Sequence, residues 1–316
     1  MIKTILAALI GAVLSGSAAM PAQALNSRTW ISGKGIDQTG CGPVATPCRT
    51  LQYAHDATSA GGEVDVMDAA GYGALKVSKA INIINDGAGV AGVLSAPGGN
   101  EAIEIDAGSN DTIVLRGLTI EGGGTGTGGI VFKSGGSLHV EKCAVQNFGQ
   151  GSGISIDPVN NGYATVFITD TSVLNNGSSG IFIGGYYRIE GAIQRVTLTG
   201  NSNGLYIISA TNGPKRLQVG NVVASYNGAQ AFHIESAGSN VNVMISNCLM
   251  SGSSTGLYTS GAPLVFLDRS TITNNTYGVH NPNSTQLYSF RTNVVNGNTT
   301  ADFDSGSSFN TSFNLQ

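Results

Sequence analysis

The sequence is poor in charged residues. Only 11% of its 316 residues are charged, the formal net charge is −4, and the isoelectric point is near 5.5. Nucleic-acid-binding domains normally carry a basic field, so this balance argues against a nucleic-acid partner. The hydrophobic fraction of 41% in turn excludes a disordered chain, because disorder requires low hydrophobicity together with high net charge.

Long apolar runs are also scarce. The only extended run, Ile5 to Val13, follows the positively charged Lys3 and precedes the small-x-small sequence Ala22-Gln23-Ala24. This order predicts a signal peptide over residues 1–24 and a mature chain that starts at Leu25. The run is shorter than the ~20 residues of a membrane helix, and no later run is long enough. We therefore expect a secreted or periplasmic protein without a membrane span.

What the chain does have is a repeat of short strands. Between Thr165 and Ile183 two stretches with period-two apolar residues flank the turn Asn175-Asn176-Gly177. A small residue followed by an apolar one returns every 22 to 27 residues, at Ile130, Ile154, Ile181, Leu205, Phe232, Leu257 and Val279. This period, without a helical stripe or a leucine-rich-repeat pattern, predicts a β-solenoid.

The repeat resembles that of a known superfamily. The pattern Val-x-Ile-x-x-Ser-x-Val-x-Asn-Asn followed by Gly-Ile resembles the right-handed parallel β-helix repeat of pectin-lyase-like proteins. It is carried by Val166, Ile168, Ser172, Asn175, Asn176, Gly180 and Ile181, and the resemblance runs from about Val64 to about Phe303. It implies an all-β fold, a single right-handed parallel β-helix. It does not imply an activity, because the superfamily contains lyases, glycosidases, esterases, epimerases and proteins with no known activity.

These patterns predict four parts of the chain: a signal peptide (1–24), an N-terminal segment with a helical cap (25–63), the β-helix (64–303) and a C-terminal tail (304–316). Residues 25–49 are expected to be irregular. Thr50 to Ala60 predicts a short helix with Thr50 as its N-cap, stopped by Gly61-Gly62, that covers the open end of the solenoid. His55 is expected to be solvated, and the tail shows no recognisable cap.

The four cysteines fall into two pairs. Cys41 and Cys48 bracket a short polar turn, which in an oxidising compartment predicts a local disulfide rather than an incomplete metal site. Cys143 and Cys248 share a repeat position with Ser172 and Ser270. At ~4.8 Å per coil, four coils place these two thiols roughly 19 Å apart, too far for a bridge, so we expect them to be buried and free.

The turn asparagines are interpreted as structural. An Asn side chain at a turn bonds to its own backbone and to the Asn of the next coil. The candidates for such a ladder are Asn147, Asn175, Asn201, Asn227 and Asn274.

Function is expected on outward positions of the strands. If the repeated apolar residues point inward, their next neighbours point outward and form a row of mostly ring-bearing side chains. This ring row consists of Ser155, Phe182, Tyr206, His233, Tyr258 and His280, and the outward row beside it of Lys133, Asp157, Gly184, Ile208, Glu235 and Ser260. Rings flanked by charges suit an extended polysaccharide, whereas the structural alternative is a ladder of rings that only stabilises the sheet.

A second outward row suggests self-association. It is predicted to contain His139, Phe167, Gln194, Gln218, Met244, Phe266 and Tyr288. A partly apolar stripe of this kind often marks contact with another protein, and Phe167, Met244, Phe266 and Tyr288 are the candidate contact residues.

Motifs for catalysis are few. Arg188-Ile189-Glu190 resembles only part of the basic motif of polygalacturonases, and Asp157-Pro158 only the start of an alginate-epimerase motif. Asp157 and Glu235 are expected ~14 Å apart, too far for a hydrolytic pair. His233 and Glu235 are expected ~7 Å apart on one strand face, with Lys215 and Arg216 in the preceding loop. No motif indicates a cofactor or a metal, including the calcium that lyases of this superfamily often bind.

Three functions therefore stay open. The preferred interpretation is an exported protein that engages a polysaccharide along the ring row with little or no catalysis. The alternatives are a polysaccharide lyase or glycoside hydrolase acting near His233, Glu235 and Asp157, and a structural surface protein that assembles through its second row.

Overall fold

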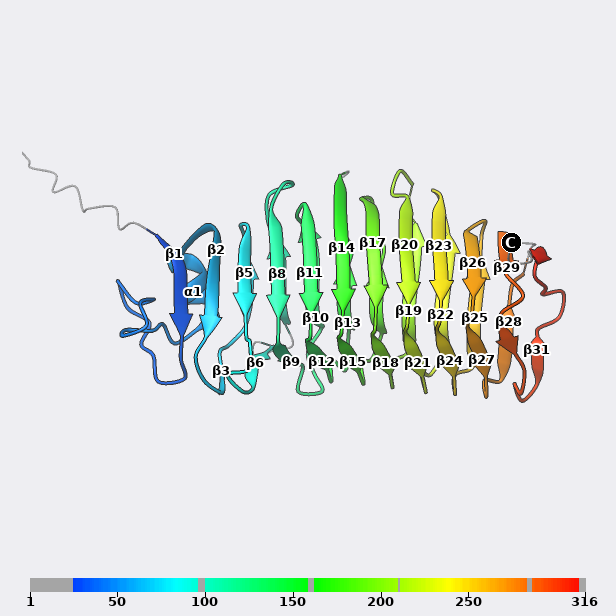
Figure 1. Ribbon diagram of the computed structural model, residues 1–316, viewed down its shortest axis with the longest axis horizontal. Coiled ribbons are helices and arrows are strands. Elements are labelled where there is room, and N and C mark those ends of the chain that lie inside the picture. The colour runs from blue at the N-terminus through cyan, green and yellow to red at the C-terminus, as the bar shows by residue number, and fades with distance from the viewer. Residues whose placement is uncertain (1–24, 96–99, 159–161, 210, 283–285, 313–316) are drawn as a thin grey trace, which may run out of the picture.

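The protein is a long solenoid of short parallel strands (Figure 1). This computed structural model describes residues 25–95, 100–158, 162–209, 211–282 and 286–312. The predicted signal peptide lies outside the described residues. Most coils contribute one strand to each of three sheets, called A, B and C below, and neighbouring strands in every sheet are parallel.

Within the described residues, sheet A contains twelve strands and sheets B and C ten each. Sheet A is formed by β1 (Asn26–Ile31), β2 (Thr58–Val66), β5 (Ile81–Ile84), β8 (Thr112–Arg116), β11 (Ser137–Glu141), β14 (Tyr163–Thr169), β17 (Arg188–Gln194), β20 (Lys215–Gly220), β23 (Val241–Ser246), β26 (Leu264–Asp268), β29 (Gln286–Ser289) and β32 (Thr311–Ser312). Sheet B is formed by β3 (Ala70–Gly71), β6 (Ala91–Leu94), β9 (Leu118–Glu121), β12 (Ala144–Gln146), β15 (Ser172–Leu174), β18 (Thr197–Thr199), β21 (Val223–Ser225), β24 (Leu249–Ser251), β27 (Thr271–Thr273) and β30 (Val294–Val295). Sheet C is formed by β4 (Leu75–Val77), β7 (Glu101–Asp106), β10 (Gly128–Ser134), β13 (Ser152–Ile156), β16 (Ser179–Ile183), β19 (Asn203–Ser209), β22 (Gln230–Ser236), β25 (Thr255–Ser260), β28 (Tyr277–His280) and β31 (Ala301–Phe303).

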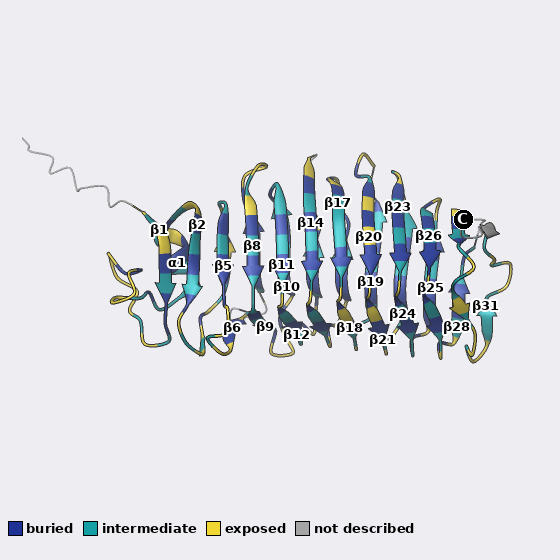
Figure 2. Ribbon diagram, viewed as in Figure 1, coloured by how far each residue is buried: buried dark blue, intermediate teal, exposed yellow. Residues whose placement is uncertain are grey.

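The core is a continuous stack of aliphatic side chains. Along β14, Ala164, Val166 and Ile168 are buried while the residues between them are not, as the period-two pattern predicts. Figure 2 shows the same alternation of buried and more exposed bands along the strands of sheet A. The register of the parallel strands aligns Ile154 with Ile181 and Ile181 with Leu205, so these side chains stack from coil to coil. Burying each such side chain stabilises the coil by about 1.5–3 kcal/mol.

A buried amide ladder fixes the turn between sheets B and C. The backbone N–H of Asn176 donates to Oδ1 of Asn201, and that of Asn201 to Oδ1 of Asn227, both at 3.1 Å. Ser253 holds the next position, and the ladder continues through Asn275. Asn201 and Asn227 match the sequence prediction. Asn147, Asn175 and Asn274 instead lie one residue before the ladder position and have positive φ angles. The ladder positions of these coils are held by Phe148, Asn176 and Asn275.

The N-terminal end begins earlier than the sequence indicated. Residues expected to be irregular form β1, which pairs with β2 and extends sheet A. Helix α1 (Leu51–Ala57) is shorter than predicted, since Thr58 already starts β2. Its N-cap is Thr50, whose side chain accepts a hydrogen bond from the backbone N–H of Tyr53. Cys41 and Cys48, in the connection between β1 and α1, form a disulfide.

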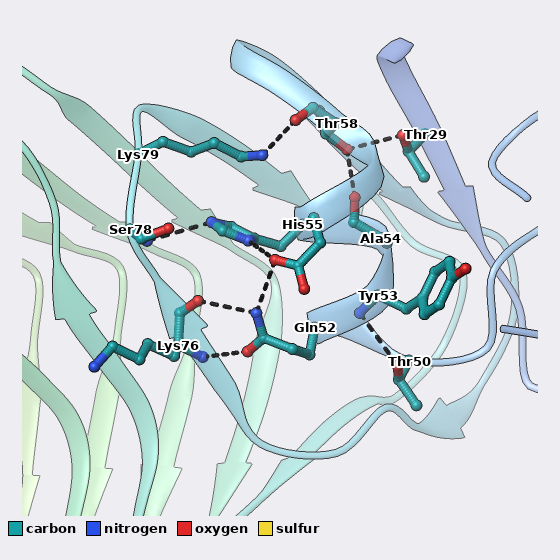
Figure 3. A network of polar contacts seen from close by, with 11 residues as sticks. Thr29, Thr50, Gln52, Tyr53, Ala54, His55, Thr58, Lys76, Ser78 and Lys79 are labelled. Atoms are coloured by element: carbon teal, nitrogen blue, oxygen red, sulfur yellow. Dashed lines mark hydrogen bonds and ion pairs between the residues drawn. The ribbon is translucent and has the colours of Figure 1, made fainter. Parts of the chain in front are cut away.

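The expectation that His55 is solvated is wrong, because its side chain is only 2% exposed. Nδ1 lies 2.8 Å from Oδ1 of Asp56, and Nε2 accepts from the backbone N–H of Ser78 (Figure 3). Beside it, Gln52 bonds to both the N–H and the carbonyl of Lys76. Helix α1 therefore covers the edge of β4 with side-chain amide and imidazole groups in place of a neighbouring strand.

The other end of the solenoid continues into the tail. Strand β31 pairs with β28, and β32 pairs with β29, so residues beyond 303 still follow the coil. The rings of Phe303 and Phe309 meet edge to face at 5.2 Å. These contacts cover part of the last coil.

The remaining cysteines are core residues. Cys143 and Cys248 are free, and each is 3% exposed. Burial raises the pKa of each thiol to about 11. Ser270 shares their repeat position as expected, but Thr171 rather than Ser172 does so in its own coil.

Candidate functional site

The outward ring row lies on sheet C, one ring per coil. Strand register aligns Phe182, Tyr206, His233, Tyr258 and His280. Successive ring centroids are 5.4, 4.2, 4.6 and 4.9 Å apart. Tyr206 and His233 stack at 13°, and Tyr258 and His280 at 3°. In these stacked pairs the ring faces are turned toward each other, which stabilises the sheet and leaves mainly edges for a ligand.

One polar cluster lies in this row. The Tyr206 hydroxyl donates to Oε2 of Glu235 at 2.8 Å, and Nε2 of His233 lies 3.6 Å from the same oxygen. Burial lowers the pKa of His233, and the Glu235 charge opposes that shift only in part. Burial and the bond to Glu235 raise the pKa of Tyr206. The imidazole is thus neutral at pH 7, and its buried Nε2 has no hydrogen-bond partner among the described residues.

The other charged residues named from the sequence do not join this cluster. Lys133 pairs with Glu104 at 3.1 Å, on coils before the ring row begins. At the corner between sheets C and A, burial raises the pKa of Asp157. Lys215 and Arg216 lie in β20 rather than in a loop, so their expected grouping with His233 and Glu235 is wrong. Lys215 is fully buried and donates to three backbone carbonyls.

The second outward row lies on sheet A and differs from the prediction at one residue. Strand register aligns Phe167 with Ala192, and Ala192 with Gln218. Gln194, expected in this row, lies one outward position further along β17, beside Thr169 and Gly220. The row continues as predicted through Met244, Phe266 and Tyr288. A methyl group therefore stands where a long side chain was expected.

Because Ala192 has only a methyl group, a hollow of about 490 Å³ lies over it on the face of sheet A. Phe167 stands on one side of Ala192, and Met244 and Phe266 stand on the other. Gly191 precedes Ala192 at an inward position with φ of 151°, where a Cβ would be 1.8 Å from the carbonyl oxygen of Val166. Only glycine permits this close approach of β17 to β14.

Charged side chains gather at one end of the hollow. Glu190 and Arg216 line it, and Oε1 of Glu190 lies 2.5 Å from the guanidinium of Arg188 and 3.3 Å from that of Arg216. The Tyr163 hydroxyl donates to the other carboxylate oxygen. The bond from Arg188 is the main reason that the pKa of Glu190 is lowered. Two guanidinium groups share one carboxylate, so the rim carries one excess positive charge.

The described residues show no candidate metal cluster. They contain no cluster of three or more His, Cys, Asp or Glu side chains placed to bind a metal ion. The part of the chain that the structure describes also has no helix long and apolar enough to cross a membrane.

The comparisons with known proteins concern the fold. No protein-family model and no curated protein matches the chain. A crystal structure of pectate lyase Pel9A is similar, with a TM-score of 0.54, over 92% of this chain and 77% of that chain. The fold is the pectin-lyase-like right-handed parallel β-helix. At 14% sequence identity this likeness extends to the pectin-lyase-like fold alone.

The ring row follows from the sequence pattern, whereas the hollow over Ala192 was not predicted. The residues that open it, Gly191 and Ala192, are small and carry no functional motif. The sequence did contain one indication that Ala192 faces outward. It lies between Ile189 and Ile193, which both point inward. Two rim residues, Arg188 and Glu190, had been noted in the sequence as part of the Arg188-Ile189-Glu190 motif.

Proposed function

We propose that this β-helix binds an extended polysaccharide across sheet A, with one sugar residue seated in the hollow over Ala192. The observation that carries the proposal is the break in a row of large outward side chains at Ala192. Phe167 and Phe266 provide apolar contact for the C–H faces of a sugar ring, and Gln218 and Asn242 provide amide groups for its hydroxyls.

The charge at the rim favours an acidic sugar. Arg188 and Arg216 both bond to Glu190, and Arg216 is still more than half exposed. A guanidinium group has five donors, so one bonded carboxylate leaves donors for a second. A uronate carboxylate placed beside Arg216 would balance the excess positive charge.

The same residues favour binding over turnover. The titratable side chains that line the hollow are Glu190 and Arg216. Arg188 keeps the pKa of Glu190 below its usual value, which makes the carboxylate a weak base, and an arginine stays protonated near neutral pH. Neither group is suited to abstract a proton at neutral pH.

The test is retention on immobilised polygalacturonate beside a neutral glucan, with turnover assayed in parallel. Ala192→Trp fills the hollow and is expected to weaken retention at least tenfold. Gln194→Trp adds the same side chain at the next outward position of β17 and is the matched control. Arg216→Gln should weaken retention of the acidic polymer alone. Equal retention by the wild type and Ala192→Trp would refute the site.

The ring row on sheet C is a second candidate site, for catalysis as well as for binding. It is favoured by one observation, the unpartnered Nε2 of His233 beside Glu235. A neutral imidazole and a carboxylate at 3.6 Å can take part in general acid–base catalysis. Release of unsaturated or reducing-end product that is lost in His233→Ala would support a lyase or hydrolase. Retention lost in Tyr206→Ala/Tyr258→Ala but kept in Ala192→Trp would move binding to this row.

A further inference from the structure

One exposed tyrosine occupies a backbone position that suits it poorly. The residue before each step of the amide ladder has a positive φ, in coil after coil. From β12 onward the residues at this position are Asn147, Asn175, Gly200, Tyr226, Gly252, Asn274 and Gly297. Asn and Gly tolerate this left-handed conformation, whereas a bulky aromatic residue does so at a cost in free energy. Tyr226, with φ of 53°, is the one large side chain in the series.

This conformation gives the ring a specific location. Tyr226 is 74% exposed, so burial of apolar surface does not explain its presence. Its ring lies against the next coil at Gly252, where a Cβ would be 2.8 Å from Cδ1 of the ring. Glycine is therefore needed at position 252 for the ring to rest there. One side of the ring is supported by backbone, and most of the residue is open to solvent.

The surroundings of the ring are polar and uncharged. Tyr226 borders a hollow of about 490 Å³ at the turn between sheets B and C. The other lining residues are Asn227, Gly228, Gly252, Ser253, Ser254, Asn274, Asn275, Thr276 and Thr299. Of these, Ser254, Asn274, Thr276 and Thr299 are exposed and carry hydroxyl or amide groups that can face a ligand.

We propose that Tyr226 is the stacking platform of a neutral-sugar site at this turn. A supported, exposed aromatic ring offers its free face to the C–H groups of a pyranose, and the neighbouring hydroxyls and amides offer hydrogen bonds. The absence of a charged side chain from the residues lining this hollow separates the site from the rim of the sheet A hollow, and it selects against uronates. The backbone strain at an exposed residue then has a functional reason.

The test uses purified mature protein and defined oligosaccharides: cellohexaose, mannohexaose, xylohexaose and hexagalacturonate. Affinities are measured by isothermal titration or by NMR shifts for the wild type, Tyr226→Asn and Tyr226→Phe. We expect at least one neutral hexasaccharide to bind, about tenfold more weakly to Tyr226→Asn and within about twofold of wild type to Tyr226→Phe. Ala192→Trp should leave this binding unchanged, so the site is tested independently of the proposed function.

Thermal unfolding separates a binding role from a packing role. Asn is the residue at the same position in three other coils, at Asn147, Asn175 and Asn274, so Tyr226→Asn should unfold at the wild-type temperature or above it. Three results would overturn the proposal. They are no binding of any neutral hexasaccharide by the wild type, equal binding by Tyr226→Asn, or hexagalacturonate binding that falls in Tyr226→Asn to the same extent.

Discussion

The hydroxyl of Tyr206 donates to Oε2 of Glu235 from the neighbouring coil, at 2.8 Å. The same carboxylate oxygen lies 3.6 Å from Nε2 of His233, which is buried and has no hydrogen-bond partner in the part of the chain that the structure describes. Tyr206 and His233 therefore compete for one carboxylate in the middle of the ring row. Because burial lowers the pKa of His233 and raises that of Tyr206, the tyrosine is the donor at neutral pH.

Removing the Tyr206 hydroxyl should change the titration of His233. In Tyr206→Phe the carboxylate of Glu235 loses its donor, so its charge acts more strongly on the imidazole and the pKa of His233 rises. The lost hydrogen bond should also lower the free energy of unfolding by about 0.5–1.5 kcal/mol. NMR titration of the imidazole proton and chemical denaturation measure the two effects. Tyr258→Phe removes a hydroxyl from the same row and is the control; an unchanged His233 titration in Tyr206→Phe contradicts the coupling.

Lys215 should make stability depend on pH in the alkaline range. Burial lowers its pKa from 10.5 to about 8 in the folded protein. Between these two values the unfolded chain binds more protons than the folded one, so the free energy of unfolding rises as the pH increases from 8 to 10.5. Below pH 8 both states are protonated, and the full cost of burying the charge remains.

Lys215→Met tests this linkage. The Nζ group donates to the carbonyls of Gly185, Tyr187 and Gly213 at 3.0, 2.9 and 2.5 Å, and the variant leaves all three without this donor. We expect a loss of about 3 kcal/mol at pH 7 and a flatter stability profile above pH 8 than the wild type. Urea unfolding at several pH values measures both. Arg216→Gln controls for the loss of positive charge, and parallel profiles for the wild type and Lys215→Met would contradict the assignment.

The ring row could be predicted from the sequence because the repeat itself supplies the register. Parallel strands in a solenoid align residue by residue, so Tyr206, His233 and Tyr258 follow from the position of the preceding apolar residue. The bond from Tyr206 to Glu235 could not be predicted in the same way. It depends on side-chain rotamers that join two coils across adjacent outward rows.

The misplacement of Gln194 has a related cause. An error of two residues keeps a side chain on the same face of a strand, so apolar alternation alone does not reveal it. Gly191 makes the error easy, because it breaks the run of large inward residues between Ile189 and Ile193. The case of His55 differs. Its imidazole is buried against the sheet edge, where Nε2 accepts from the backbone N–H of Ser78. The helical sequence pattern of residues 50–60 does not reveal this contact.

Completing the amide ladder should stabilise the protein. Ser253 is the one hydroxyl between Asn227 and Asn275, and it accepts from Asn227 N–H at 3.3 Å. The Asn201 side chain accepts from Asn176 and donates to Asn227, and the side chain of Ser253→Asn should likewise reach both of its neighbours. This change should raise the free energy of unfolding by about 0.5–1.5 kcal/mol. Thermal and urea unfolding measure the change. Asn201→Ala, which removes a ladder amide, should lower stability, whereas destabilisation by Ser253→Asn would show that this coil is too narrow for an amide.

The cap on β4 should control association between molecules. Oε1 of Gln52 accepts from Lys76 N–H at 2.7 Å, and Nε2 of His55 accepts from Ser78 N–H at 3.3 Å. Burial lowers the pKa of His55, so this nitrogen remains an acceptor at neutral pH. Gln52→Ala/His55→Ala removes both acceptors from the edge of β4, which then becomes available to strands of other molecules.

We therefore expect the double variant to aggregate faster than the wild type while most of the solenoid keeps its circular dichroism. Static light scattering during incubation below the unfolding temperature measures this rate. Lys142→Ala, at the turn between β11 and β12 and away from the edge of β4, is the control and should aggregate like the wild type. If the double variant stays monomeric, helix α1 protects the edge through its apolar contacts at Leu51 and Ala54 rather than through its polar side chains.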